Sequence, residues 1–148
     1  MKEDNGEMIG IKSEDAQVKV IYEYCLLRYV ADVEREEFVN IGLMMMSKRY
    51  RWLRSAVLLS ENRIEGFFHS ADLPRLRVQA SLFERDDVPD AELSVEERYR
   101  WMAAVKSAVL QTSPSHPGIL ILPAGTETAE IRRRLDGKFD ELMARLVE

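Results

Sequence analysis

Four polar residues near position 30 have the types and the spacing to do chemistry together: Arg28, Glu36, Glu37 and Asn40. Arginine presents a planar fork of N–H donors that matches a carboxylate or a phosphate, and asparagine offers both a donor and an acceptor. The four could therefore form a substrate or phosphate site. We favour the alternative, an ion pair and a side-chain cap that fix a turn, because charged turns are common and exposed ion pairs contribute little.

His116 is a second candidate for catalysis, as a general base for the hydroxyl of Ser113 or Ser115. Nucleophilic catalysis also needs a third group that orients the base, and neighbours in sequence seldom supply that geometry. The chain has no G-x-S-x-G motif. We therefore favour a structural loop here, or a loop that contacts the charged turn.

Metal and nucleotide sites have no motif in this sequence. His69 and His116 are far apart, and Asp86, Asp87 and Asp90 lack the spacing of a calcium loop. No glycine-rich phosphate loop occurs. We expect neither a cofactor nor a metal, although the sequence does not exclude a magnesium ion held by carboxylates.

Composition indicates an ordinary folded protein. The chain has 148 residues, of which 46% are hydrophobic and 32% charged, with a formal net charge of −5. This length favours one domain, which we place at residues 18–148. Residues 1–17 are polar and acidic, and we expect a flexible tail there, or a weak strand at 8–11.

The single cysteine, Cys25, rules out a disulfide within the chain and is typical of a reducing compartment. No apolar run reaches the roughly 20 residues that a membrane span needs. The first 17 residues contain no apolar signal-peptide core. We therefore expect a cytoplasmic protein that does not enter a membrane.

A basic stretch at residues 48–54 is the best candidate for contact with nucleic acid. Aromatic rings beside arginines can stack on and hold single strands. A charged strand edge that resists aggregation is the commoner explanation, and the negative net charge disfavours nucleic acid as a partner. The residues concerned are Lys48, Arg49, Arg51 and Arg54, beside Tyr50 and Trp52.

Strands are predicted at residues 18–30, 38–46 and 51–59, which are rich in β-branched, aromatic and other apolar types. Short connections favour an antiparallel meander, with the first strand central because both of its faces are apolar. Gly42 indicates a bulge or a close backbone approach. Residues 44–46 are all methionine and fill the core or form a pliable partner surface; we favour the core.

Helices are predicted near residues 73–85, 94–109 and 127–146, where apolar residues recur at steps of three and four. Asp72 and Ser94 are the expected N-caps of the first two. Residues 119–122 are expected in a short strand or an extended loop, and residues 60–70 in a linker with one helical turn. The predicted fold class is α+β, an antiparallel meander sheet of about three to four strands covered by about three helices.

Two stretches of this sequence form a recognisable pattern. The first runs from residue 27 to residue 42, and the second runs from residue 111 to residue 118 and is followed by the C-terminal helix. Together they resemble a bacterial family of uncharacterised proteins, domain of unknown function 3037. Where the family has prolines beside the aspartate, this chain has Ala31 and Val33, which implies a less rigid tip. The residues that carry the resemblance, and our candidates for function or partner binding, are Arg28, Tyr29, Asp32, Arg35, Glu37, Asn40, Gln111, Ser113 and His116.

The resemblance implies a partner more than a reaction. Members of this family are often encoded beside a kinase-like protein similar to HipA, the toxin of a toxin–antitoxin pair. This implies a non-enzymatic interaction partner or regulator of such a kinase. The alternative is a small enzyme that acts on nucleic acid or on a phosphorylated substrate through Arg28, Glu37, Asn40 and His116.

Overall fold

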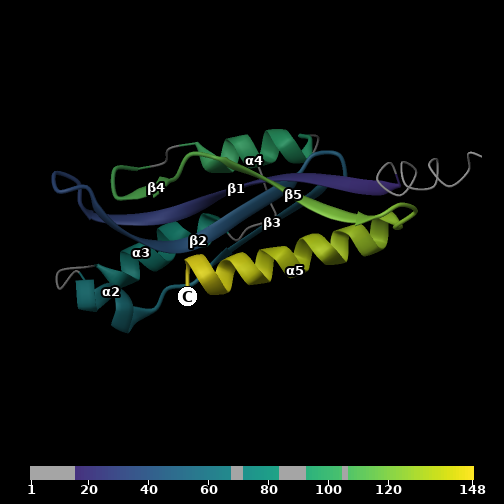
Figure 1. Cartoon of the computed structure of the whole chain (residues 1–148). Helices are drawn as coiled ribbons and strands as arrows, with labels where there is room; N and C mark the ends of the chain where they lie inside the picture. Colours follow the sequence, from purple (N-terminus) through teal and green to yellow (C-terminus); the bar gives the residue numbers. More distant parts are fainter. Residues whose placement is uncertain (1–15, 68–71, 84–92, 105–106) are drawn as a thin grey trace, which may run out of the picture.

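An antiparallel sheet forms the centre of the protein in the computed structural model, which describes residues 16–67, 72–83, 93–104 and 107–148 (Figure 1). In the described residues, β1, β2 and β3 lie side by side, which confirms the predicted meander. β4 and β5 pair with the remaining edge of β1. The strands are β1 (Gln17–Asp32), β2 (Glu37–Ser47), β3 (Trp52–Val57), β4 (Leu110–Thr112) and β5 (His116–Pro123).

β1 is the strand that organises the sheet, because its 16 residues serve three partners. One edge pairs with β2 from Glu23 to Asp32. The other edge pairs with β5 along residues 17–24 and with β4 along residues 27–29. The central position predicted for this strand is therefore confirmed.

The helices confirm the predicted α+β class and both predicted N-caps. Asp72 accepts the N–H of Arg75, and Ser94 forms a capping box with Glu97. A helix occupies part of the segment expected to be a linker with a single turn. The described helices are α2 (Glu61–Phe67), α3 (Leu73–Ala80), α4 (Val95–Ala103) and α5 (Thr128–Leu146), with a 3₁₀ turn, η1 (Ser81–Phe83), after α3.

α4 ends six residues earlier than predicted, and β5 is longer than predicted. The Thr112 hydroxyl donates to the carbonyl of Ala103, 2.5 Å away, and so satisfies an acceptor at the end of α4. The Val109 carbonyl, expected inside the helix, accepts the N–H of Val30 at 2.7 Å instead. Pairing with β1 thus overrides the helical spacing of this segment, since the sheet offers partners that a longer helix could not.

Helices cover both faces of the sheet (Figure 1). α5 lies on one face and buries Ile131, Leu135, Phe139 and Leu142 against β1, β2 and β3. On the other face, α2, α3, η1 and α4 pack against Cys25, Leu27 and Tyr29 of β1 and their neighbours in β2. The described residues therefore form two cores on opposite sides of one sheet.

The predicted irregularity at Gly42 is confirmed. The β1–β2 register shifts between Leu27 and Arg28, where Gly42 lies opposite Leu27 and Asn40 lies opposite Arg28. A Cβ on Gly42 would stand 2.9 Å from the Ala56 carbonyl oxygen, so this approach requires glycine. The shift exchanges the faces of β2: Ile41 lies in the same core as Met44 and Met46, whereas strict alternation would separate them.

The three methionines of residues 44–46 are buried, as expected of core residues: Met44 and Met46 on the α4 side of the sheet and Met45 on the α5 side. No helix in the described ranges is long and apolar enough to cross a membrane. The weak strand considered at 8–11 lies outside the described residues, as do His69, Asp86, Asp87 and Asp90.

Candidate functional site

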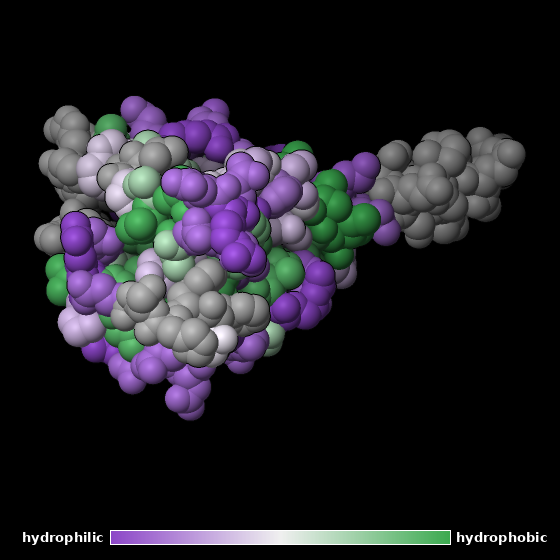
Figure 2. Space-filling view, turned by 90° about the vertical axis from the view of Figure 1, so that its left-hand side faces the viewer, coloured by the Kyte–Doolittle hydropathy of each residue, from purple (hydrophilic) through white to green (hydrophobic). Residues whose placement is uncertain are grey.

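The β1–β2 turn is held by its own charged side chains. Arg35 forms an ion pair with Glu37 at 2.9 Å, and the side chains are 69% and 52% exposed. The Asp32 carboxylate accepts the backbone N–H of Arg35 at 3.1 Å, and Glu36 adopts the left-handed backbone region with φ 56°. In Figure 2, which looks at the side that contains this turn, hydrophilic atoms are widespread and the hydrophobic areas between them are small. These contacts are those of a solvated turn.

Arg28 and Asn40 lie opposite each other on adjacent strands, behind the turn. The Arg28 guanidinium carbon stands 4.2 Å from the centre of the Phe38 ring, a cation–π contact. Asn40 donates from Nδ2 to the carbonyl of Leu146, 3.2 Å away, at the end of α5. Arg28 Nε and Asn40 Oδ1 are both buried and make no hydrogen bond. This pair thus offers one free donor and one free acceptor.

Arg63 of α2 completes the contacts at the end of α5. Its Nη1 donates to the backbone carbonyl of Asn40 at 3.3 Å and also to the carbonyl of Val147. Cations and N–H donors favour the carbonyl end of a helix. Sequence reasoning missed Arg63, because it lies in a segment expected to be a linker and nothing in its spacing marks it.

Gln111 and Ser113 both bond to backbone groups, and Ser113 does so on the edge of β1 that faces away from β2. Ser113 bonds to Leu26 twice: its Oγ accepts the Leu26 N–H, and its own N–H donates to the Leu26 carbonyl, both at 2.8 Å. The Ser113 hydroxyl donates to the Pro114 carbonyl, 2.9 Å away. Gln111 donates to the carbonyl of Ala108 at 2.7 Å. Ser113 therefore bridges the gap between β4 and β5.

His116 is exposed and packs beside an aromatic ring. Its ring centre lies 5.3 Å from that of Tyr24, its partner across the strand pair. The Ser115 hydroxyl bonds to Glu23 and to the Tyr99 hydroxyl, at 2.9 Å each. The described contacts of Ser113 and Ser115 thus go to groups other than His116.

A chain of polar groups links β1 to α4. Arg100 donates to Glu23 at 2.7 Å, and this hydrogen bond, with that from Ser115, holds the pKa of Glu23 below its usual value. Burial raises the pKa of Tyr99 and of the Cys25 thiol. Tyr29, another predicted residue, is buried in the α4-side core, and burial raises its pKa as well. These shifts favour the neutral forms of the phenols and of the thiol.

The predicted residues therefore occupy separate places along β1. Glu37 lies opposite Asp32, whereas His116 lies opposite Tyr24. The step from Tyr24 to Asp32 spans about 26 Å of extended strand. A small substrate could not reach both Glu37 and His116.

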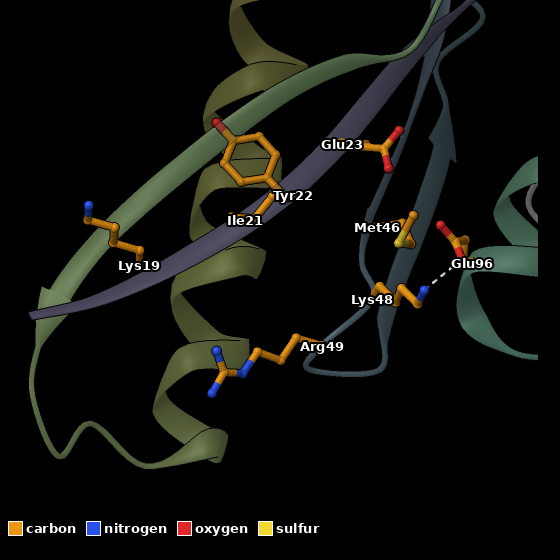
Figure 3. A pocket seen from close by; sticks show the side chains of 8 residues that line it. All are labelled: Lys19, Ile21, Tyr22, Glu23, Met46, Lys48, Arg49 and Glu96. Atoms are coloured by element: carbon orange, nitrogen blue, oxygen red, sulfur yellow. Dashed lines mark ion pairs between the residues drawn. The ribbon is translucent and has the colours of Figure 1, made fainter.

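A groove opens where β1 continues beyond the end of β2 (Figure 3). Its volume is about 520 Å³. The β2–β3 turn supplies Lys48 and Arg49, and Lys48 pairs with Glu96 of α4 at 3.2 Å. We call this feature the β1 groove; it is lined by Lys19, Ile21, Tyr22, Glu23, Met46, Lys48, Arg49 and Glu96.

Large apolar side chains are exposed beside the β1 groove. Ile21, Ile119 and Ile121 are 64%, 49% and 55% exposed. Ile21 pairs with Ile119, and Ile121 lies two residues further along β5, so all three share one face of the sheet. Sequence reasoning missed this surface, because four apolar residues in a row at 119–122 do not reveal which of them a helix covers.

The basic stretch at residues 48–54 divides between two roles. Trp52 is buried and donates to Asp136 at 3.1 Å, and Arg54 pairs with Asp140 at 3.1 Å, so α5 holds both. Arg49 and Arg51 instead line a second hollow of about 410 Å³ with Tyr50, Thr128 and Arg132. Trp52 is therefore not available for stacking on a base.

No group of three His, Cys, Asp or Glu side chains that could hold a metal ion occurs among the described residues. A family model described as a protein of unknown function (DUF3037) matches residues 24–147. The chain belongs to this family. Neither the curated proteins nor the solved structures contain a match.

The DUF3037 match covers all nine residues predicted from the sequence, from Arg28 to His116. The β1 residues of the groove, Lys19 to Glu23, precede the matched range. The function of the groove has therefore to be argued from the geometry of this chain.

Proposed function

We propose that this DUF3037 protein is a non-enzymatic interaction partner or regulator of a HipA-like kinase. The observation that carries the interaction is the exposed apolar surface of Ile21, Ile119 and Ile121 beside a groove with charged walls. Apolar residues grouped on a surface and rimmed by polar ones are typical of protein-binding sites. The choice of a kinase as partner rests on the family resemblance, because members of this family are often encoded beside such a kinase.

Internal use of the polar candidates also favours binding over catalysis. Ser113 and Ser115 bond to groups other than His116, and Glu37 pairs with Arg35. A hydrolytic or transfer reaction needs a nucleophile, a base and an orienting group within hydrogen-bond reach of one another. An interaction protein needs none of these.

The test is binding of the full chain to a HipA-like kinase from the same organism, measured by isothermal titration calorimetry. We expect a complex with a Kd of about 1 μM or tighter. Ile119→Asp should weaken it about tenfold or more, because a carboxylate would enter an apolar contact, and should leave the melting temperature unchanged.

The matched control is Val78→Asp on α3, which also places a carboxylate at an exposed apolar position, 70% exposed, away from the groove. Its Kd should equal that of the native chain. A native chain that does not bind the kinase would overturn the proposal. Equal losses of affinity in both variants would show that the surface of Ile21, Ile119 and Ile121 is not the binding site.

A further inference from the structure

At the N-terminal end of β1, one edge has no neighbouring strand among the described residues. The β1–β2 pairing begins at Glu23 opposite Met46, so in the described structure no strand pairs with residues 17–21 on that side. Ser47 is the last residue of β2, and its hydroxyl donates to the carbonyl of Ile21 at 2.9 Å. The chain then turns away through residues 48–51 to β3. We call residues 17–21, on the side of β2, the open edge.

The backbone groups of the open edge point into the β1 groove. Backbone N–H and C=O groups of one residue point to the same side of a strand, and the side alternates from residue to residue. Leu26 and Val30 bond to Ser113 and Val109 on the β4–β5 side, so the odd-numbered residues face β2. The Ile21 carbonyl, which meets Ser47, agrees with this. Lys19, which lines the groove, therefore directs both its N–H and its C=O toward the side of β2.

The charges around the open edge select for an acidic ligand. The two carboxylates of the groove are already engaged: Glu23 by Arg100 and Glu96 by Lys48. Among the described contacts, Lys19 has no carboxylate partner, and Arg49 contacts the ring of Tyr50 at 5.9 Å. Arg49 also lines the neighbouring hollow, which adds Arg51 and Arg132 and no acidic residue. The cationic surface therefore extends past the groove.

We propose that an extended, acidic and apolar peptide of the partner protein adds as a strand to the open edge of β1. Its backbone would pair with Lys19 and Ile21, in the position beside β1 that β2 occupies as far as Ser47. Lys19 and Ile21 share one face of β1, so on that face the peptide would place an apolar side chain on Ile21 and a carboxylate near Lys19, and further carboxylates would meet Arg49. Five residues span about 16 Å, the length of a typical strand. This deepens the proposed function, since it names the surface and the chemistry of the partner segment.

The probe is the fluorescein-labelled octapeptide Glu-Glu-Val-Val-Glu-Glu-Val-Val, which carries glutamate and valine on both faces of an extended strand. Its binding to the full chain is followed by fluorescence anisotropy. We expect saturable binding that the double variant Lys19→Glu with Arg49→Glu weakens about tenfold or more. Arg145→Glu, a charge reversal at an exposed residue of α5, is the control and should leave the Kd unchanged. Methylation of alternate backbone nitrogens of the peptide should abolish binding, because it removes the donors of the ladder.

Binding that survives methylation of the peptide nitrogens would overturn strand addition, and so would absence of binding at about 1 mM peptide. Dimerisation of the free protein that Lys19→Glu with Arg49→Glu prevents would make a second copy the occupant and would equally overturn the proposal. The assay contains no kinase. A negative result here therefore leaves the calorimetric test of the kinase partner intact, and a negative result there leaves strand addition intact.

Discussion

At the scale of single residues, Asn40 connects three elements. Its side chain donates to Leu146 at the end of α5, and its carbonyl accepts from Arg63 of α2. The sequence predicted that Arg28, Glu37 and Asn40 lie near one turn, where the strand register decides which side chains meet, and in the structure Arg28 lies opposite Asn40. It could not predict that Glu37 would pair with Arg35 instead, because that choice depends on side-chain reach at an exposed turn.

Asn40→Ala should lower the free energy of unfolding by about 1 kcal/mol, the usual worth of one partly buried hydrogen bond. Urea denaturation followed by circular dichroism measures the loss. Asn62→Ala, at an exposed position of α2, is the control and should stay within about 0.5 kcal/mol of the native chain. Equal effects in the two variants would show that the contact with α5 contributes nothing.

At the scale of elements, the sequence predicts well what is local. The N-caps at Asp72 and Ser94 and the apolar spacing of α5 are set within a few residues. The early end of α4 and the full length of β5 depend on pairing with β1, which lies far away in the sequence. Pro117 and Pro123 also argued against a strand as long as β5. Both prolines are tolerated because, among the described strands, β5 pairs with β1 alone.

Replacement of Gly42 or of Gly137 by alanine should change the free energy of unfolding in opposite directions. Gly42→Ala should lower the free energy of unfolding by about 1–3 kcal/mol, because its Cβ would stand 2.9 Å from the Ala56 backbone oxygen. Gly137→Ala, within α5 and with no atom within 4 Å of the added Cβ, should raise it by about 0.5–1 kcal/mol. Thermal and urea unfolding of both variants measure the difference. Stabilisation by Gly42→Ala would contradict the close approach.

At the scale of the whole molecule, the described helices cover both faces of the sheet but do not cover one end of it. α5 spans one face (Figure 1). The helices on the other face leave Ile21, Ile119 and Ile121 exposed. The sequence predicted the α+β class and the antiparallel meander, with about three to four strands and three helices, where the described residues form five strands and four α-helices. It did not predict where the helices stop covering the sheet. On the face opposite α5, α4 packs on β2 and β3, and Arg100 donates to Glu23 of β1 at 2.7 Å.

The central claim is that a partner binds this protein at the open edge of β1. Hydrogen–deuterium exchange of the full chain, with and without a HipA-like kinase from the same organism, tests it most directly. The account predicts slower exchange at the amides of Lys19 and Ile21 in the complex, and little change at the turn of residues 33–36. Protection confined to that turn, with exchange at Lys19 and Ile21 unaltered, would contradict it.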